Sequence, residues 1–283
     1  MIQWYYLALI SSAMLGVATL LEKNTLKVEH AMAYSTSFSV IMALISLLFL
    51  PLANFNISAL SIVLIYLLSL MSAAIYWLLA RVYKHGSVSA ASPVYNALPN
   101  FFIVIFAFLF LGEKLTTLQY FFTGVLIFAT YLIMFTGKPQ FESKKYVQWL
   151  ILASLISAVQ ATGMKYLLLN ANPYTYLILL EVFVALNMVI GMQLKYGGIK
   201  ETFGNTLKYK KEIVLIAAFT TAYRVFYYVA ASMANIALVW PLSNVLNVIM
   251  LVFLGGLIFK EGSVKRKLVI AAAMLAAIYF LVV

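Results

Sequence analysis

The feature that most constrains this chain is the length of its uncharged apolar stretches. Residues 31–80 contain no charged side chain, and neither do residues 3–21, 86–112 and 225–259. A helix needs about 20 apolar residues to cross the hydrocarbon of a bilayer. The chain is 65% hydrophobic and only 10% charged, whereas soluble domains carry about 25% charged residues. The sequence therefore predicts an all-α integral membrane protein.

Breaks at charged residues and at Pro, Asn or Gly divide the chain into ten expected transmembrane helices. Their expected limits are 3–22, 31–50, 58–81, 87–111, 117–136, 146–168, 173–194, 212–232, 235–259 and 265–283. The break between the eighth and ninth spans lies in ASMANIA, which contains no charge. The first span lacks the basic start that is typical of a cleaved signal peptide.

The fourth and ninth expected spans repeat each other at a shift of 148 residues. The shift aligns Pro93 with Pro241, Asn96 with Asn244, and Glu113 with Glu261. Each half then contains five spans, in residues 1–137 and 146–283, joined by a linker at 138–145. Because five is odd, the second half is expected to enter the membrane from the opposite side. Such inverted five-helix repeats are typical of transporters with alternating access.

The repeated segment also carries a family resemblance. Residues 79–116, LARVYKHGSVSAASPVYNALPNFFIVIFAFLFLGEKLT, have small residues at the start of a span, a proline before an apolar run, and a closing Gly-Glu-Lys-Leu-Thr. The segment resembles the hallmark of the drug/metabolite transporter superfamily, in its EamA-type family. The second copy ends in FKEGSV and keeps the Glu without the preceding Gly. The resemblance implies ten spans and secondary transport, often export, of small metabolites.

Two charged residues lie deep inside expected spans. Arg224 is near the middle of the eighth span, where an arginine costs about 2.5–3.5 kcal/mol on insertion scales. It is a candidate anchor for a substrate carboxylate or phosphate, with Tyr227 on the same helical face; the alternative is a structural ion pair. Glu181 is a candidate proton-coupling carboxylate in the seventh span, and alternatively pairs with Arg224 or Lys165.

Amide side chains form two stripes at repeat-related positions. Asn96 and Asn100 are four residues apart in the fourth span, and Asn244 and Asn247 are three apart in the ninth. Amides in hydrocarbon need hydrogen-bond partners, so bonds between helices are one explanation. The other explanation is that the two stripes form opposing walls of a substrate cavity.

Aromatic and basic side chains complete the set of candidate substrate contacts. Tyr76, Trp77 and Trp240 are candidate cavity aromatics that could grip an apolar or cationic group. Lys23 and Lys165 lie near span ends, where anchoring at the membrane interface is the simpler explanation. The family resemblance implies that Lys23 could instead line the central cavity.

The repeated Glu113 and Glu261 are expected to have a structural role. An acid at the C-terminal end of a helix opposes the dipole of that helix, so capping is not the expected explanation. Each is predicted to pair with its adjacent lysine and to close a hairpin, with gating as the alternative. Pro93 and Pro241 are expected to kink their helices or to free backbone carbonyls for a ligand.

The composition argues against several other kinds of function. The chain has no Asp, no Cys and two His, and it lacks a P-loop, so a catalytic site, a metal site and a cofactor are not expected. Its net charge of +11 lies mainly in short loops, so nucleic acid is not an expected partner. Expected partners are a small-molecule substrate, the lipid bilayer and a coupling ion such as H⁺. The protein is expected as a monomer or homodimer in the cytoplasmic membrane of the cell.

These observations predict a secondary transporter with a cavity lined by spans one, three, four, six, eight and nine. An excess of positive charge in the cavity favours an anionic or zwitterionic, amino-acid-like metabolite, moved as an exporter. The alternatives are an exporter of lipophilic cations coupled through Glu181, a passive channel, and a receptor or scaffold. The distribution of Lys and Arg places both termini outside the cell, whereas the resemblance implies termini inside, so both orientations stay open.

Overall fold

The described part of the chain is built from helices, as predicted. The computed structural model describes residues 3–25, 31–85, 88–135, 144–196, 210–258, 269–270, 272–277 and 280. The helices are α1 (Trp4–Thr25), α2 (Ala31–Ser46), the 3-10 helix η1 (Leu47–Leu52), α3 (Ala59–His85), α4 (Val88–Leu111), α5 (Thr117–Phe135), α6 (Lys144–Leu168), α7 (Pro173–Tyr196), α9 (Lys210–Met233) and α10 (Ile236–Ile258). They correspond closely to the first nine expected spans, including the break in ASMANIA. Of the tenth span, residues 269–270, 272–277 and 280 are described, and they are helical.

Six helices of the described residues are long and apolar enough to cross a membrane. These candidate spans are Trp4–Glu22, Met32–Leu52, Ala59–Leu79, Lys145–Leu168, Pro173–Lys195 and Lys210–Met233. Shorter apolar segments lie in α4, α5 and α10. Large apolar side chains, including Leu48, Phe110 and Leu194, are exposed on the outer surface, where a bilayer would cover them. The chain is therefore a multi-pass membrane protein.

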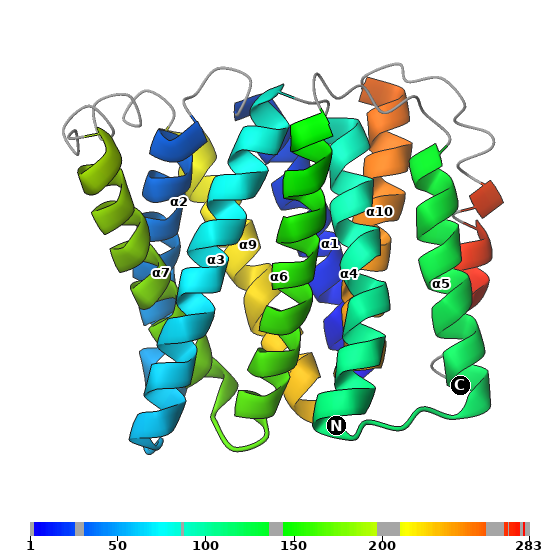
Figure 1. Cartoon of the computed structure of the whole chain (residues 1–283), viewed down its shortest axis with the longest axis horizontal. Coiled ribbons are helices and arrows are strands. Elements are labelled where there is room, and N and C mark those ends of the chain that lie inside the picture. Colours follow the sequence, from blue (N-terminus) through cyan, green and yellow to red (C-terminus); the bar gives the residue numbers. More distant parts are fainter. Residues whose placement is uncertain are drawn as a thin grey trace.

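The two halves of the chain interlock in the bundle (Figure 1). The helix α1 ends at the upper end of the view, whereas α6 begins there, so the two run in opposite directions. The helix α1 packs mainly against α9 and α10 of the second half, and α6 packs mainly against α3 and α4 of the first half. The helices α2 and α7 pack against each other. Neither half therefore forms a bundle of its own.

The lower end of the bundle is tied together by a polar corner. Asn172 caps α7, because its Oδ1 accepts hydrogen bonds from the backbone N–H groups of Tyr174 (2.9 Å) and Thr175 (3.2 Å). Pro173 follows at the first helical position, where a missing N–H is harmless. Thr175 Oγ1 donates to the carbonyl of Asn54 (2.7 Å) and accepts from its N–H (2.8 Å). The segment after η1 is thus fastened to α7 across the two halves.

Close packing of α1 on α10 leads to a first prediction. A Cβ atom at Gly16 would lie 2.8 Å from Sδ of Met250 and 3.4 Å from Cα of Asn247. We expect Gly16→Leu to lower the free energy of unfolding by about 1–3 kcal/mol, as overpacking does elsewhere. Gly124→Leu is the matched control, because a Cβ atom at Gly124 would meet no other atom within 4 Å. Unfolding in mixed micelles measures both variants, and equal stabilities would contradict the prediction.

Candidate functional site

A central cavity of about 190 Å³ lies between the two halves of the chain. Side chains of α1, α2, α3, α4, α6, α7, α9 and α10 line it. The lining therefore includes all six predicted spans together with α2 and α7. Because both halves supply its walls, any movement of one half against the other changes the shape of the cavity.

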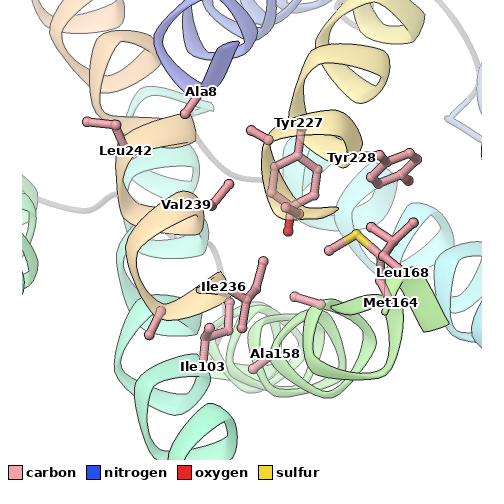
Figure 2. Packing of buried hydrophobic residues seen from close by; sticks show 14 of the residues in the cluster. Ala8, Ile103, Ala158, Met164, Leu168, Tyr227, Tyr228, Ile236, Val239 and Leu242 are labelled. Atoms are coloured by element: carbon pink, nitrogen blue, oxygen red, sulfur yellow. The ribbon is translucent and has the colours of Figure 1, made fainter. Parts of the chain in front are cut away.

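The lining of the cavity extends toward the upper end of the bundle on α1 and α2. Its lining on α1 runs from Leu15 to Glu22, and its lining on α2 runs from Tyr34 to Phe38, so it reaches toward the upper end in Figure 1. Toward the lower helix ends, packed apolar side chains border the cavity, and Figure 2 shows part of this cluster. This lower cluster includes Ala8, Ile103, Ala158, Met164, Leu168, Tyr227, Tyr228, Ile236, Val239 and Leu242. Met164, Tyr227 and Tyr228 of this cluster also line the cavity, so the cluster borders the cavity directly.

Arg224 joins three helices at the wall of the cavity. Its Nη1 donates to Oε1 of Glu181 in α7, and its Nη2 donates to the hydroxyl of Tyr76 in α3. The side chain of Glu181 is 0% exposed and that of Arg224 is 12% exposed. Arg224 lines the cavity and Glu181 does not. The charge of Arg224 is therefore balanced inside the bundle, while the remaining donors of its five N–H groups are available to a ligand.

The described residues of the cavity show no excess of positive charge. Lys165 is 7% exposed and lies outside the cavity lining. Its Nζ donates to the carbonyls of Ala231 (2.8 Å) and Ala234 (2.9 Å), because the last carbonyls of α9 lack donors within the helix. The side chain of Lys23 lies outside the described residues. Among the described lining residues, only Arg224 and Glu22 are charged.

Aromatic side chains dominate the walls of the cavity. They are Tyr34, Phe38, Tyr76, Tyr95, Tyr176, Tyr223, Tyr227, Tyr228 and Trp240. The rings of Tyr223 and Tyr227 stack at 5.8 Å, and the ring of Trp240 meets that of Tyr227 edge-on at 5.6 Å. Such walls suit a ligand with a flat or apolar body.

Trp77 was predicted to line the cavity, but it is not among the lining residues. Its ring packs near that of Trp149 at 6.4 Å, and Nζ of Lys195 lies 4.6 Å from its ring centroid. Successive residues of an α-helix point about 100° apart, so Trp77 faces elsewhere when its neighbour Tyr76 faces the cavity.

Several buried polar atoms of the cavity wall have no hydrogen-bond partner in the described part of the chain. They are the hydroxyls of Tyr34, Tyr176 and Tyr227, Nε1 of Trp240 and Oδ1 of Asn247. Leaving a buried polar group unpaired costs about 1–3 kcal/mol. A polar ligand in the cavity could satisfy these groups. By contrast, Nδ2 of Asn244 already donates to the carbonyl of Trp240 at 2.8 Å.

The two asparagine stripes do not form simple opposing walls. Asn244 and Asn247 line the cavity, whereas Asn100 borders a separate void of about 10 Å³ with Asn244 and Pro241. Pro241 lies within α10, which continues through it. The backbone of α4 likewise continues through positions 93 and 96, and the side chains of Pro93 and Asn96 lie outside the described residues.

Glu113 caps a helix of the other half, which corrects the argument against capping. Its Oε1 accepts a hydrogen bond from the N–H of Ile236 (3.0 Å), and its Oε2 accepts one from the N–H of Ala237 (3.3 Å). These N–H groups begin α10, where a carboxylate is favoured by the helix dipole. The dipole of its own helix α4 was the wrong one to consider. Glu261 lies outside the described residues.

The sequence reasoning missed Glu22 as a cavity residue. The first span was expected to end at residue 22, but α1 continues to Thr25, and Glu22 lines the cavity. The aromatic pair Tyr34 and Phe38 beside it was also missed. These two residues are four positions apart and therefore share one helical face. This spacing could have identified them as a pair from the sequence.

The comparisons with known proteins agree with this fold. Residues 2–135 match the EamA-like transporter family. A solved chain whose printed description is "Crystal structure of protein" superposes with a TM-score of 0.70 over 98% of this chain and 95% of its own, at 12% identity. That similarity shows a shared fold only. No curated protein matches the chain. The resemblance to the EamA-type family is thus confirmed over residues 2–135, which match the EamA-like transporter family.

Proposed function

We propose that the protein is a secondary transporter that moves a small amphipathic metabolite by alternating access. The observation that carries the proposal is a polar and aromatic cavity that is lined by both halves and bordered on one side by a packed apolar cluster. A binding site near the midplane that is sealed on one side is what alternating access requires. A receptor or scaffold does not require a cavity between two halves of the chain.

The packing of the helices supports ten spans arranged as two inverted five-helix repeats. Exchanging α1 with α6, α2 with α7, α3 with α9, and α4 with α10 leaves the main pattern of contacts unchanged. The pairs α1–α9 and α1–α10 become α6–α3 and α6–α4, and the pair α3–α7 becomes α9–α2. Such a relation favours two states in which the cavity faces opposite sides.

The direction of transport is proposed from the charges at the upper end of the bundle. Lys145, Lys195, Lys210 and Lys211 lie exposed near the ends of α6, α7 and α9 that are uppermost in Figure 1. The positive-inside rule assigns this end to the cytoplasm, with both termini outside. The cavity then reaches toward the cytoplasm and would load its substrate there, as an exporter of the cytoplasmic membrane does.

The proposed substrate is zwitterionic rather than purely anionic. Arg224 offers donors to a carboxylate, but Glu181 already balances its charge, so a second anion would gain little. Glu22 supplies negative charge at the upper part of the same cavity. A molecule with both charges and an apolar body fits these walls better than an anion does.

Asn247 provides the test of this site. We expect Asn247→Ala to weaken binding of a transported compound about two- to twelvefold, the effect of losing one hydrogen bond of about 0.5–1.5 kcal/mol. Asn244→Ala is the matched control, since that amide already donates to Trp240. Thermal shifts of the purified protein would identify binding compounds, and counterflow in proteoliposomes would show whether they are exchanged. Bound compounds that show no counterflow would contradict transport.

Export of lipophilic cations is a second candidate, favoured by the aromatic walls and by Glu22. Glu181 is less suited to bind a cation directly, because it is fully buried and paired with Arg224. Its role as a proton-coupling group stays a prediction. Growth protection against lipophilic cations on expression, without counterflow of zwitterions, would favour this candidate.

A further inference from the structure

The side chain of Glu22 lies where a ligand in the cavity can contact it. Its side chain lines the upper part of the cavity, and its carboxylate lies beside the hydroxyl of Tyr34 in α2. Arg224 is the only basic side chain among the described lining residues, and it is engaged by Glu181. No ion pair of Glu22 occurs within the described residues. Within the described residues, the carboxyl group of Glu22 thus faces the cavity without a basic partner.

Aromatic rings surround the same part of the cavity. The rings of Tyr34 and Phe38 stack with their centroids 5.7 Å apart, and the ring of Tyr76 meets Phe38 edge-on at 5.9 Å. All three residues line the cavity with Glu22. A carboxylate next to aromatic faces attracts an organic cation through both charge and cation–π interactions.

We propose that Glu22, together with Tyr34, Phe38 and Tyr76, forms a subsite for the ammonium group of the substrate. This inference rests on the proposed transport function and specifies its substrate as an amine or a zwitterion that bears an amine. The polar groups near Asn247 and Trp240 then receive the rest of the molecule. A carboxylate without an amine gains nothing from this subsite.

Three probes with one common body test the subsite: 2-phenylethylamine, phenylalanine and 3-phenylpropionate. They carry an ammonium group, both charges, and a carboxylate, respectively. We expect Glu22→Gln to weaken binding of the amine and of the zwitterion about 10- to 150-fold, the range for losing a hydrogen bond between charged groups. Binding of 3-phenylpropionate should not weaken. Affinities would be measured from thermal shifts at graded concentrations, each relative to the unliganded form of the same variant.

Two further variants separate a lost contact from a damaged fold. Glu22→Asp keeps the charge and should retain part of the affinity for the amine. Glu212→Gln makes the same change at an exposed glutamate in the first turn of α9, and should leave all three affinities unchanged.

The outcomes separate this inference from the proposed function. If Glu22→Gln leaves affinity for the amine and the zwitterion unchanged while Asn247→Ala lowers it, the subsite is wrong and the transport site stands. If neither ammonium-bearing probe binds the wild-type protein, the subsite is also wrong. The transport function itself fails only if no compound that binds the protein is exchanged in counterflow.

Discussion

Replacing Glu181 with alanine is expected to destabilise the protein by about 3–5 kcal/mol. Removing one partner of a buried ion pair leaves the other as an uncompensated buried charge. Glu181 is fully buried, and Arg224 keeps only 12% of its side chain exposed, so the loss of the carboxylate would leave the guanidinium poorly solvated. Unfolding of the purified protein in mixed micelles, followed by tryptophan fluorescence, measures the change.

The double variant Glu181→Ala/Arg224→Ala provides the decisive control. Once both charges are gone, most of the penalty disappears, so the double variant should be more stable than Glu181→Ala alone. Glu212→Ala, at an exposed position of α9, should change stability by less than about 0.5 kcal/mol. Additive losses in the double variant would show that the two residues do not form an energetically coupled pair.

The helices were predictable because the bilayer imposes a strong physical rule. A spanning segment must be predominantly apolar along its length, so long apolar runs with few charges mark α1 to α7, α9 and α10. The same rule predicted that Arg224 needs a partner, since a lone charge in hydrocarbon is costly. Arg224 was one of the two partners proposed for Glu181. Because charged residues are rare inside the spans, a pairing of Arg224 with Glu181 could be proposed from the sequence alone.

The interlocking of the two halves could not be predicted in the same way. The apolar pattern shows which residues form a helix, but it does not show which other helices this helix contacts. The reason is that lipid-facing and helix-facing surfaces are both mainly apolar. Glu113 illustrates the difference. Its repetition at Glu261 indicated a structural role, but its partner lies at the start of α10, more than one hundred residues away. Only the packing of α4 and α5 near α10 brings these groups together.

Glu113 is expected to hold the lower end of the proposed transporter closed. It joins the hairpin between α4 and α5 to the first N–H groups of α10, and hydrogen bonds to charged groups contribute about 1.5–3 kcal/mol. If these bonds exist only when the lower end is closed, Glu113→Ala should raise the relative population of the opposite state about 10- to 150-fold. The chain has no cysteine, so a single introduced cysteine reports this change without further substitutions.

Two alanines of α1 suit such a probe. Ala8 is fully buried in the lower cluster, and Ala18 lines the cavity. Adding Glu113→Ala should speed the reaction of a water-soluble maleimide with Ala8→Cys, and should not speed its reaction with Ala18→Cys. Lys114→Ala alters the exposed neighbour of Glu113 and should leave both rates unchanged. If Lys114→Ala instead matched Glu113→Ala, the ion pair within the hairpin, and not the cap on α10, would control the closed end.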